Sequence, residues 1–313
     1  MEQKVLLLPC SSYSAPELKS CLELILKEFA QVLPRTGAKV LLKPNMVKAL
    51  SRESCGTTDP VFIEVLIECG LERGWQISVG DSPAIGSLEQ AARANGLYDI
   101  LKRQNIPLLQ LSGNEHSALD DRDIYTAPQL KTFDALINVP KLKGHRQLYF
   151  TGATKNLFGC MAGKRKVWQH MHLSDRESGL AFAQMLLDHA NKVAPCLNIM
   201  DGIRAMAGPG PIHGKPVFEG LIAASANFMA LDLAVFEHLG GEIDEDPLMI
   251  LQQRKSPKTP AQLLFPLGRP PRGAFYFPTR EQRAPISFRP WVLLRLMWRE
   301  FMSQRTKGKT LPR

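Results

Sequence analysis

Short apolar runs alternate with helix-like segments along most of the chain, and this alternation limits the fold more than any other feature. The apolar runs have the length of buried strands, and several of the segments between them open with helix-capping residues. The predicted strands are 5–8, 39–42, 76–79, 107–111, 135–139, 197–200 and 221–224. Strands joined through helices in this way form a parallel sheet. We therefore predict an α/β fold over residues 1–249, with a mainly parallel sheet flanked by helices in three layers.

Capping residues mark where the predicted helices begin. Asp59 followed by Pro60 is typical of a helix start, and this helix is expected to run to Arg73. A serine with Glu or Gln three residues later forms a capping box, which satisfies backbone N–H groups at a helix start. Such boxes are predicted at 14–17, 87–90 and 174–177, and a further helix is predicted at 228–239.

The positive charge of the chain is concentrated in a proline-rich C-terminal tail. Residues 250–313 contain 14 Lys or Arg but only Glu281 and Glu300 as acidic residues, a net charge of +12. Because the whole chain carries +9, the remainder carries −3. The high isoelectric point therefore gives little reason to expect nucleic acid as a partner of the α/β domain.

One segment of the tail, 291–302, is predicted to be an amphipathic helix. Trp291, Trp298 and Phe301 belong to its wide apolar face, and arginines flank that face. Such a helix suits a membrane surface with anionic lipids. Docking onto the protein itself or onto a partner protein is an equal alternative, because amphipathicity alone does not distinguish them.

The sequence contains no apolar run long enough to span a membrane, and its first residues do not resemble a secretory signal. Its six cysteines are scattered and form no CxxC pair, so no zinc ribbon or iron–sulfur loop is expected. We expect a cytoplasmic protein of unknown cofactor, with peripheral binding to the inner face of the membrane left open.

Polar side chains follow four of the predicted strands at the point where each strand ends. They are Lys43 and Asn45, Asp81 and Ser82, Lys141 with Lys143 and His145, and Asp201. The carboxyl ends of parallel strands meet at one edge of a sheet, where ligands bind. These residues are therefore expected to lie together; the alternative is that the aspartates only cap loops and helices.

The stretch 137–166 is strongly basic and contains no acidic residue, since none occurs between Asp134 and Asp175. Its glycines allow a close backbone approach to a ligand. Thr154, Lys155 and Asn156 stand at a predicted helix start, where free N–H groups favour an anion. We predict an anion-binding cradle that includes Lys155 and Asn156; a solvated basic loop and a plain helix cap are the alternatives.

Three residues are candidates for catalysis. His145 titrates near neutral pH and suits acid–base work, and Asp81 is a second proton carrier. Cys160 lies among lysines that would lower the pKa of its thiol, although a small buried hydrophobic residue is the favoured description, because buried free cysteine is common. His145, His170 and His172 match no zinc pattern, and the nearby positive charges would repel a cation, so no metal site is predicted.

Seven short strings occur in the order seen in a known family: VLLKPNMV, TTDP, GDSP, INVPKLKGH, TGATKNLFGC, MDG and AGPGPIHGKP. Together they resemble the family called domain of unknown function 362. The resemblance implies a site around eight residues: Lys43, Asn45, Asp81, Lys141, Lys143, His145, Lys155 and Asn156. Some relatives carry ferredoxin-type clusters, for which this chain lacks the cysteines. Asn227 stands where the family tends to have an acid, whereas Asp232 matches.

Two functions remain open from these residues. The first is an enzyme acting on a small anionic substrate, a phosphate or carboxylate, through redox or acid–base chemistry. Six residues would hold the anion: Lys43, Asn45, Lys141, Lys143, Lys155 and Asn156. The second is a non-catalytic protein that binds an anion or nucleotide and is brought to a membrane or complex by its tail. The loop 208–216, GPGPIHGKP, is either a lid over the ligand or a plain connector.

Overall fold

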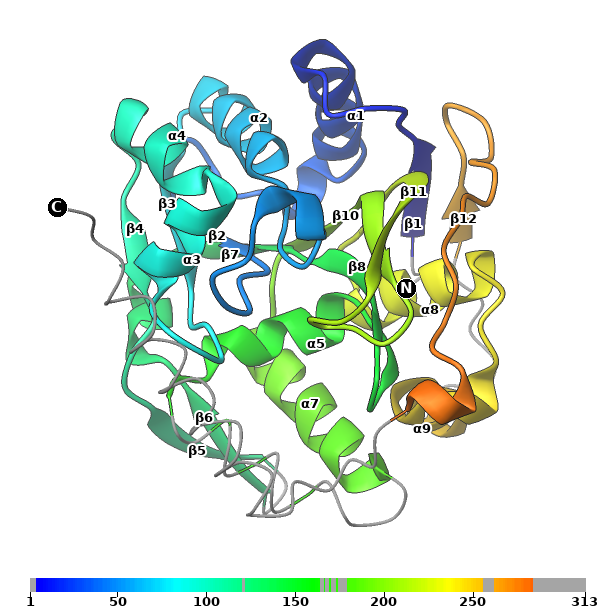
Figure 1. Cartoon of the computed structure of the whole chain (residues 1–313). Coiled ribbons are helices and arrows are strands. Elements are labelled where there is room, and N and C mark those ends of the chain that lie inside the picture. Colours follow the sequence, from blue (N-terminus) through cyan, green and yellow to red (C-terminus); the bar gives the residue numbers. More distant parts are fainter. Residues whose placement is uncertain are drawn as a thin grey trace, which may run out of the picture.

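A single mixed sheet forms the centre of the molecule (Figure 1). The computed structural model describes residues 4–119, 122–163, 166, 169, 173, 179–255 and 262–283. Eight strands follow one another across the sheet in the order β12 (Gln262–Leu264), β1 (Lys4–Pro9), β11 (Lys215–Ser225), β10 (Leu197–Ala207), β7 (Ala135–Val139), β2 (Lys39–Pro44), β3 (Gln76–Asp81) and β4 (Leu108–Gln110). Only β11 runs antiparallel to its neighbours in this row, so the prediction of a mainly parallel sheet is confirmed.

Helices cover both faces of the sheet, as the three-layer prediction requires. On one face, the helices are α1 (Ala15–Glu28), α2 (Pro60–Glu72), α3 (Leu88–Asn95) and α4 (Leu97–Arg103); on the other, they are α5 (Ala153–Leu157), α7 (Leu180–Val193), α8 (Phe228–His238) and α9 (Pro247–Lys255). Alternate residues of β1 enter the two cores: Leu6 packs with α1, whereas Leu7 packs with α8. This alternation is the two-residue period of a strand buried on both faces.

The helix caps agree with the sequence in two of the places that the structure describes. Asp59 accepts a hydrogen bond from Val61 N at the start of α2, and Ser87 and Gln90 form the predicted capping box of α3. The box predicted at Ser14 is wrong. Ser14 makes no side-chain cap, and the Glu17 carboxylate accepts hydrogen bonds from Ser11 and Ser12 instead. The box predicted at 174–177 lies outside the described residues.

The basic stretch after Val139 forms two strands rather than a loop. β8 (Lys141–His145) pairs parallel to β10, and β9 (Tyr149–Thr151) pairs antiparallel to β8. The partner strand makes this possible, because β10 and β11 form a long hairpin that extends beyond the predicted strand end at residue 200. A separate hairpin, β5 (Glu115–Leu119) with β6 (Arg122–Thr126), replaces the loop expected there.

The first part of the predicted tail packs against the α/β domain. β12 pairs with β1, and the Phe277 ring stacks on Tyr149, with ring centroids 4.5 Å apart. The Glu219 carboxylate accepts hydrogen bonds from Gly273 N and Phe275 N. The predicted amphipathic segment 291–302 lies outside the described residues. Within the part that is described, none of the helices has the length and apolar character needed to cross a bilayer.

Candidate functional site

Two buried lysine–aspartate pairs lie at the carboxyl ends of the parallel strands. Lys43 Nζ is 2.8 Å from Asp81 Oδ1, and Lys141 Nζ is 2.7 Å from Asp201 Oδ2. All four side chains are almost completely buried. Buried charges need partners, so each lysine here is neutralised by the protein. The strand-end residues therefore do converge, but two of the predicted anion-binding lysines are already paired.

Both aspartates are also hydrogen-bonded to the backbone. Asp81 accepts from Met46 N at 2.9 Å and from Ser82 N at 2.8 Å, in addition to its ion pair. Asp201 accepts from Asp59 N at 2.9 Å. Such donors hold a carboxylate in one orientation. This geometry suits an aspartate that positions a lysine.

Tyr13 is a member of this cluster that sequence reasoning missed. Its hydroxyl donates to Asp201 Oδ1 at 2.7 Å and accepts from Lys141 Nζ at 2.9 Å. Burial, followed by the charge of Asp201, raises the pKa of this phenol, so it stays protonated. A signal was available, because Tyr13 follows β1, whose carboxyl end lies on the same edge of the sheet as that of β10.

Lys143 differs from its neighbours in having no carboxylate within salt-bridge distance among the described residues. Its Nζ donates to Asn45 Oδ1 at 2.6 Å and to Gly56 O at 2.9 Å. Burial, with a further contribution from the charge of Lys141, lowers the pKa of Lys143 to about 7. The amine can therefore bind an anion when charged and exchange a proton near neutral pH.

Asparagine side chains connect Lys143 to the rest of the cluster. Asn45 Nδ2 donates to Asn156 Oδ1 at 2.8 Å, and Asn156 Nδ2 donates to Asn138 Oδ1 at 2.8 Å. The same Asn156 oxygen lies 3.5 Å from Lys43 Nζ. Asn45 and Asn156, both predicted as anion ligands, thus form an amide network that fixes the lysines.

Two more lysines border the cluster. The Lys155 ammonium lies above the Phe158 ring, 4.2 Å from its centroid, and burial lowers the pKa of Lys155 to about 7. Lys166 donates to Ser82 O, and burial lowers the pKa of Lys166 to about 8. Neither has a carboxylate partner among the described residues, so the surroundings of the cluster carry unpaired positive charge.

The N–H groups at the start of α5 are not free, contrary to the prediction. Asp232 of α8 accepts from Ala153 N at 2.6 Å and from Thr154 N at 2.9 Å. Burial raises the pKa of Asp232 to about 6 despite these donors. The protein's own carboxylate thus occupies the place where an external anion was expected. Sequence spacing could not reveal this, because the acid is contributed by a distant helix.

The glycines of the basic stretch allow close approaches within the protein. A side chain at Gly159 would collide with Asp81 and Lys43, and one at Gly144 would collide with the carbonyl oxygen of Gly208. The second contact belongs to the loop 208–216, which is tied down further by Arg146 N donating to Gly210 O at 3.0 Å. The predicted need for glycine holds, but what it accommodates here is neighbouring protein.

Two of the catalytic candidates are less available than the sequence suggested. Cys160 is fully buried, and burial raises the pKa of its thiol to about 12, which outweighs the lowering by Lys43 and Lys166. His145 is at the end of β8, and its Nδ1 lies 3.1 Å from Gln147 N and 3.2 Å from Leu148 N, which donate to it. This nitrogen therefore holds the turn after β8.

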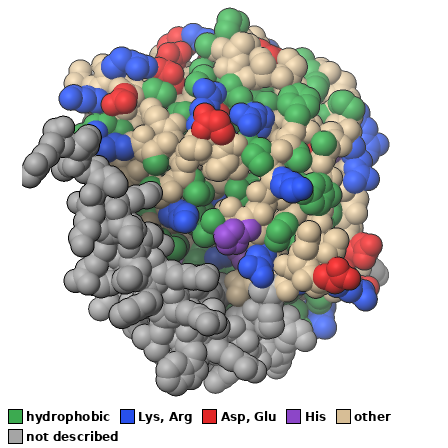
Figure 2. Space-filling view, in the orientation of Figure 1, with side chains coloured by type: hydrophobic (Ala, Val, Ile, Leu, Met, Phe, Trp, Pro, Cys, Tyr) green, Lys and Arg blue, Asp and Glu red, His purple; other side chains and the backbone are tan. Residues whose placement is uncertain are grey.

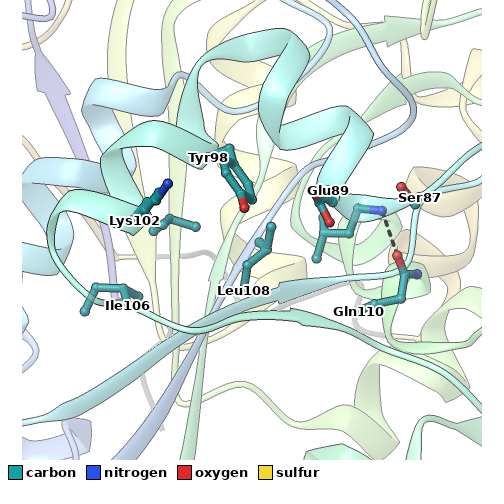
Figure 3. Close-up of a pocket in the computed structure, with 9 residues that line it drawn as sticks. Ser87, Glu89, Tyr98, Lys102, Ile106, Leu108 and Gln110 are labelled. Carbon is teal, nitrogen blue, oxygen red and sulfur yellow. Dashed lines mark hydrogen bonds between the residues drawn. The ribbon is translucent and has the colours of Figure 1, made fainter.

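Figure 2 shows the surface hollowed near the centre of the face that lies over α5, with basic side chains and a histidine near its rim. A separate pocket of about 520 Å³ lies between α3, α4 and β4, where Leu88 N donates to Gln110 Oε1 at 2.6 Å (Figure 3). Tyr98 and Leu108 are among the residues that line it, and none of the clustered lysines does.

In the described part of the chain, no group of three His, Cys, Asp or Glu side chains is placed to hold a metal ion; His170 and His172 lie outside that part.

The fold and the site are thus a mainly parallel α/β sheet with a buried lysine cluster at its carboxyl edge. The profile of the domain of unknown function 362 matches residues 40–237, and the chain belongs to that family. A thylakoid-associated protein of Synechocystis sp. is 35% identical over 275 residues, which cover 86% of this chain and 85% of the relative.

A solved structure resembles the chain in fold. The lactate racemase apoprotein from Thermoanaerobacterium thermosaccharolyticum superposes with a TM-score of 0.50 at 12% sequence identity, covering 75% of this chain and 56% of the racemase chain. A protein from Thermotoga maritima has a TM-score of 0.45 at 12% identity, covering 77% and 59% of the two chains. At this identity the likeness concerns the α/β architecture alone.

Proposed function

We propose that the protein is an enzyme that binds a small anionic substrate, a phosphate or carboxylate, at the carboxyl edge of its sheet and moves a proton with Lys143. The observation that carries this proposal is the buried Lys143 amine, which has two neutral oxygen partners and no carboxylate partner among the described residues. An anion placed beside this amine would supply the missing negative charge.

The electrostatics of the cluster support an anion rather than a cation. The Lys43–Asp81 and Lys141–Asp201 pairs are each neutral, so Lys143 decides the charge at the centre. Burial is the main reason that the pKa of Lys155 is low. Repulsion by the charge of Lys143, which lies nearby, lowers it further. An anion would favour the charged form of both amines and raise both pKa values. Binding would therefore be accompanied by proton uptake at neutral pH.

Lys143 suits acid–base catalysis better than the other candidates. A catalytic group works best when its pKa lies near the operating pH, and burial brings that of Lys143 to about 7. Asp81 is held by an ion pair and two N–H donors. We therefore assign Asp81 and Asp201 to positioning the lysines, and we assign Asn45 to orienting Lys143.

Replacing Lys143 by methionine is expected to abolish anion binding, since the charge is lost and the chain length is kept. The measurement is calorimetric titration of purified protein with sulfate, phosphate and a small hydroxycarboxylate. Lys131→Met is a matched control, because Lys131 is exposed and pairs with Glu115 away from the cluster. Equal affinity in the wild type and Lys143→Met would contradict the proposal.

A second variant separates an enzyme from a binding protein. Lys143→Arg keeps the positive charge but cannot release its proton near neutral pH. Anion binding within about tenfold of the wild type is expected, together with loss of turnover for whichever substrate the titrations identify. Undiminished turnover in Lys143→Arg would remove Lys143 as the proton carrier.

The second candidate function is that of an accessory protein at a membrane surface. The observation that favours it is the 35% identical relative, whose name describes it as thylakoid-associated. The amphipathic segment 291–302 supplies a physical route, because apolar burial and attraction of arginines to anionic lipid reinforce each other. We expect the full chain to co-sediment with vesicles containing anionic lipid and a chain ending at residue 283 to stay in solution. Equal sedimentation of the two would exclude this segment as the membrane contact.

A further inference from the structure

Two cysteines meet where β1 leads into α1. Cys10 is the residue after β1, and Cys21 lies on the buried side of α1. Cys21 Sγ is 3.9 Å from the carbonyl oxygen of Pro9, the residue bonded to Cys10, and Cys10 Sγ is 3.3 Å from Ser12 O. The Cys21 thiol therefore lies beside the Pro9–Cys10 peptide, and each of the two thiols shifts the pKa of the other. This backbone and side-chain geometry brings together two sulfur atoms that are eleven positions apart in the sequence.

This pair differs electrostatically from the other cysteines. Burial raises the pKa of the thiols of Cys55, Cys69, Cys160 and Cys196. In contrast, the interaction between the two thiols lowers the pKa of Cys21 and raises that of Cys10. Cys21 is therefore the thiol that ionises first, and a thiolate is the form that attacks a disulfide.

We propose that Cys10 and Cys21 are a redox modification site, at which a low-molecular-weight disulfide oxidises the two thiols to an intramolecular disulfide. The Cys21 thiolate attacks one sulfur of the oxidant and releases the first thiolate. Cys10 then loses its proton to that thiolate and attacks the mixed disulfide at Cys21, which releases the second. Two electrons pass from the cysteines to the oxidant, which leaves as two thiols.

The position of the pair connects it to the lysine cluster. The segment 11–14 joins Cys10 to α1 and carries Tyr13, whose hydroxyl contacts Lys141 and Asp201. A covalent bond at the base of this segment would restrain its backbone. Ser11 and Ser14 are exposed but both thiols are buried, so the oxidant reaches the thiols when the segment 11–14 moves away from them. The site does not depend on the proposed enzymatic function, because its chemistry concerns only the two thiols.

Peptide mapping of the full wild-type chain tests the proposal without a variant. The reduced protein is incubated under native conditions with oxidised glutathione, its remaining thiols are alkylated, and it is cleaved with trypsin. Cleavage after Lys4, Lys19 and Lys27 leaves the two cysteines on separate peptides, 5–19 and 20–27. The expected result is a cross-linked species of these peptides, two hydrogens lighter than their sum, that disappears on reduction.

Variants identify the attacking thiol. In Cys10→Ser, the mixed disulfide at Cys21 is expected to accumulate because no second thiol resolves it. Cys196→Ser, at a partly buried cysteine away from the pair, is the control and should cross-link as the wild type does. Two results would overturn the proposal: both peptides recovered fully alkylated from the folded wild type, or a cross-link that forms only after denaturation.

Discussion

Replacing Lys43 by methionine is expected to lower the free energy of unfolding by about 3–5 kcal/mol, the usual cost of removing one partner from a buried ion pair. The change leaves the Asp81 carboxylate buried without a counterion, supported by only two backbone N–H donors. Methionine matches the lysine in length, so the loss of packing is small and the effect is mainly electrostatic. Urea denaturation followed by circular dichroism measures it.

A double variant tests this electrostatic reason. Lys43→Met combined with Asp81→Asn removes both charges, and much of the lost stability is expected to return because no unpaired charge remains. Lys19→Met is the control for an exposed pair, that of Lys19 with Glu72, and no measurable change is expected there. The prediction fails if Lys43→Met is as harmless as Lys19→Met, or if the double variant is less stable than the single one.

The affinity of the cluster for sulfate is expected to fall by up to about tenfold per pH unit above pH 7, or about 50-fold between pH 7 and pH 9. Sulfate keeps its charge over this range, so the change reflects the protein. The pKa of Lys143 in the free protein is about 7, and only its protonated form attracts an anion. Lys155, whose pKa is also about 7, would steepen the fall if it contacts the ion.

Lys143→Arg provides the matched test, because its guanidinium stays charged at these pH values. The slope of log affinity against pH should become shallower by about one unit in this variant. The free energy of unfolding depends on pH with the opposite sign to the sulfate affinity. The folded pKa of Lys143 is depressed below 10.5, so the unfolded chain binds more protons between pH 7 and pH 10.5 and this residue's contribution to stability rises with pH. Parallel affinity slopes in the wild type and Lys143→Arg would show that Lys143 does not hold the ion.

Local patterns predicted the elements that carry the site. A buried strand is recognisable from a run of apolar residues, and Asp59 and Ser87 mark helix starts through contacts with their own neighbours. A parallel arrangement places the residues after the predicted strand ends at 42, 79 and 200 at one edge, which is why Lys43, Asp81 and Asp201 could be grouped. These inferences depend on contacts close in sequence or on a general rule of sheet topology.

The partners of those residues could not be predicted in the same way. Lys43 forms an ion pair with Asp81 on the adjacent strand. Tyr13 donates a hydrogen bond to Asp201, which is 188 positions away in the sequence, and Asp232 of α8 accepts one from Ala153 N at the start of α5. Residue type and spacing do not say which charges neutralise one another, so lysines that looked available for a ligand turned out to be paired.

The sequence by itself determined the α/β class, the positions of the main strands along the chain and the edge at which polar residues gather, because periodicity and capping are local. Only the tertiary structure decided that β8 is a strand, that Lys43 and Lys141 are neutralised, and that Lys143 lacks an acidic partner among the described residues. The physical reason is that charge state and burial depend on groups brought together by folding, and a pKa is a property of that environment.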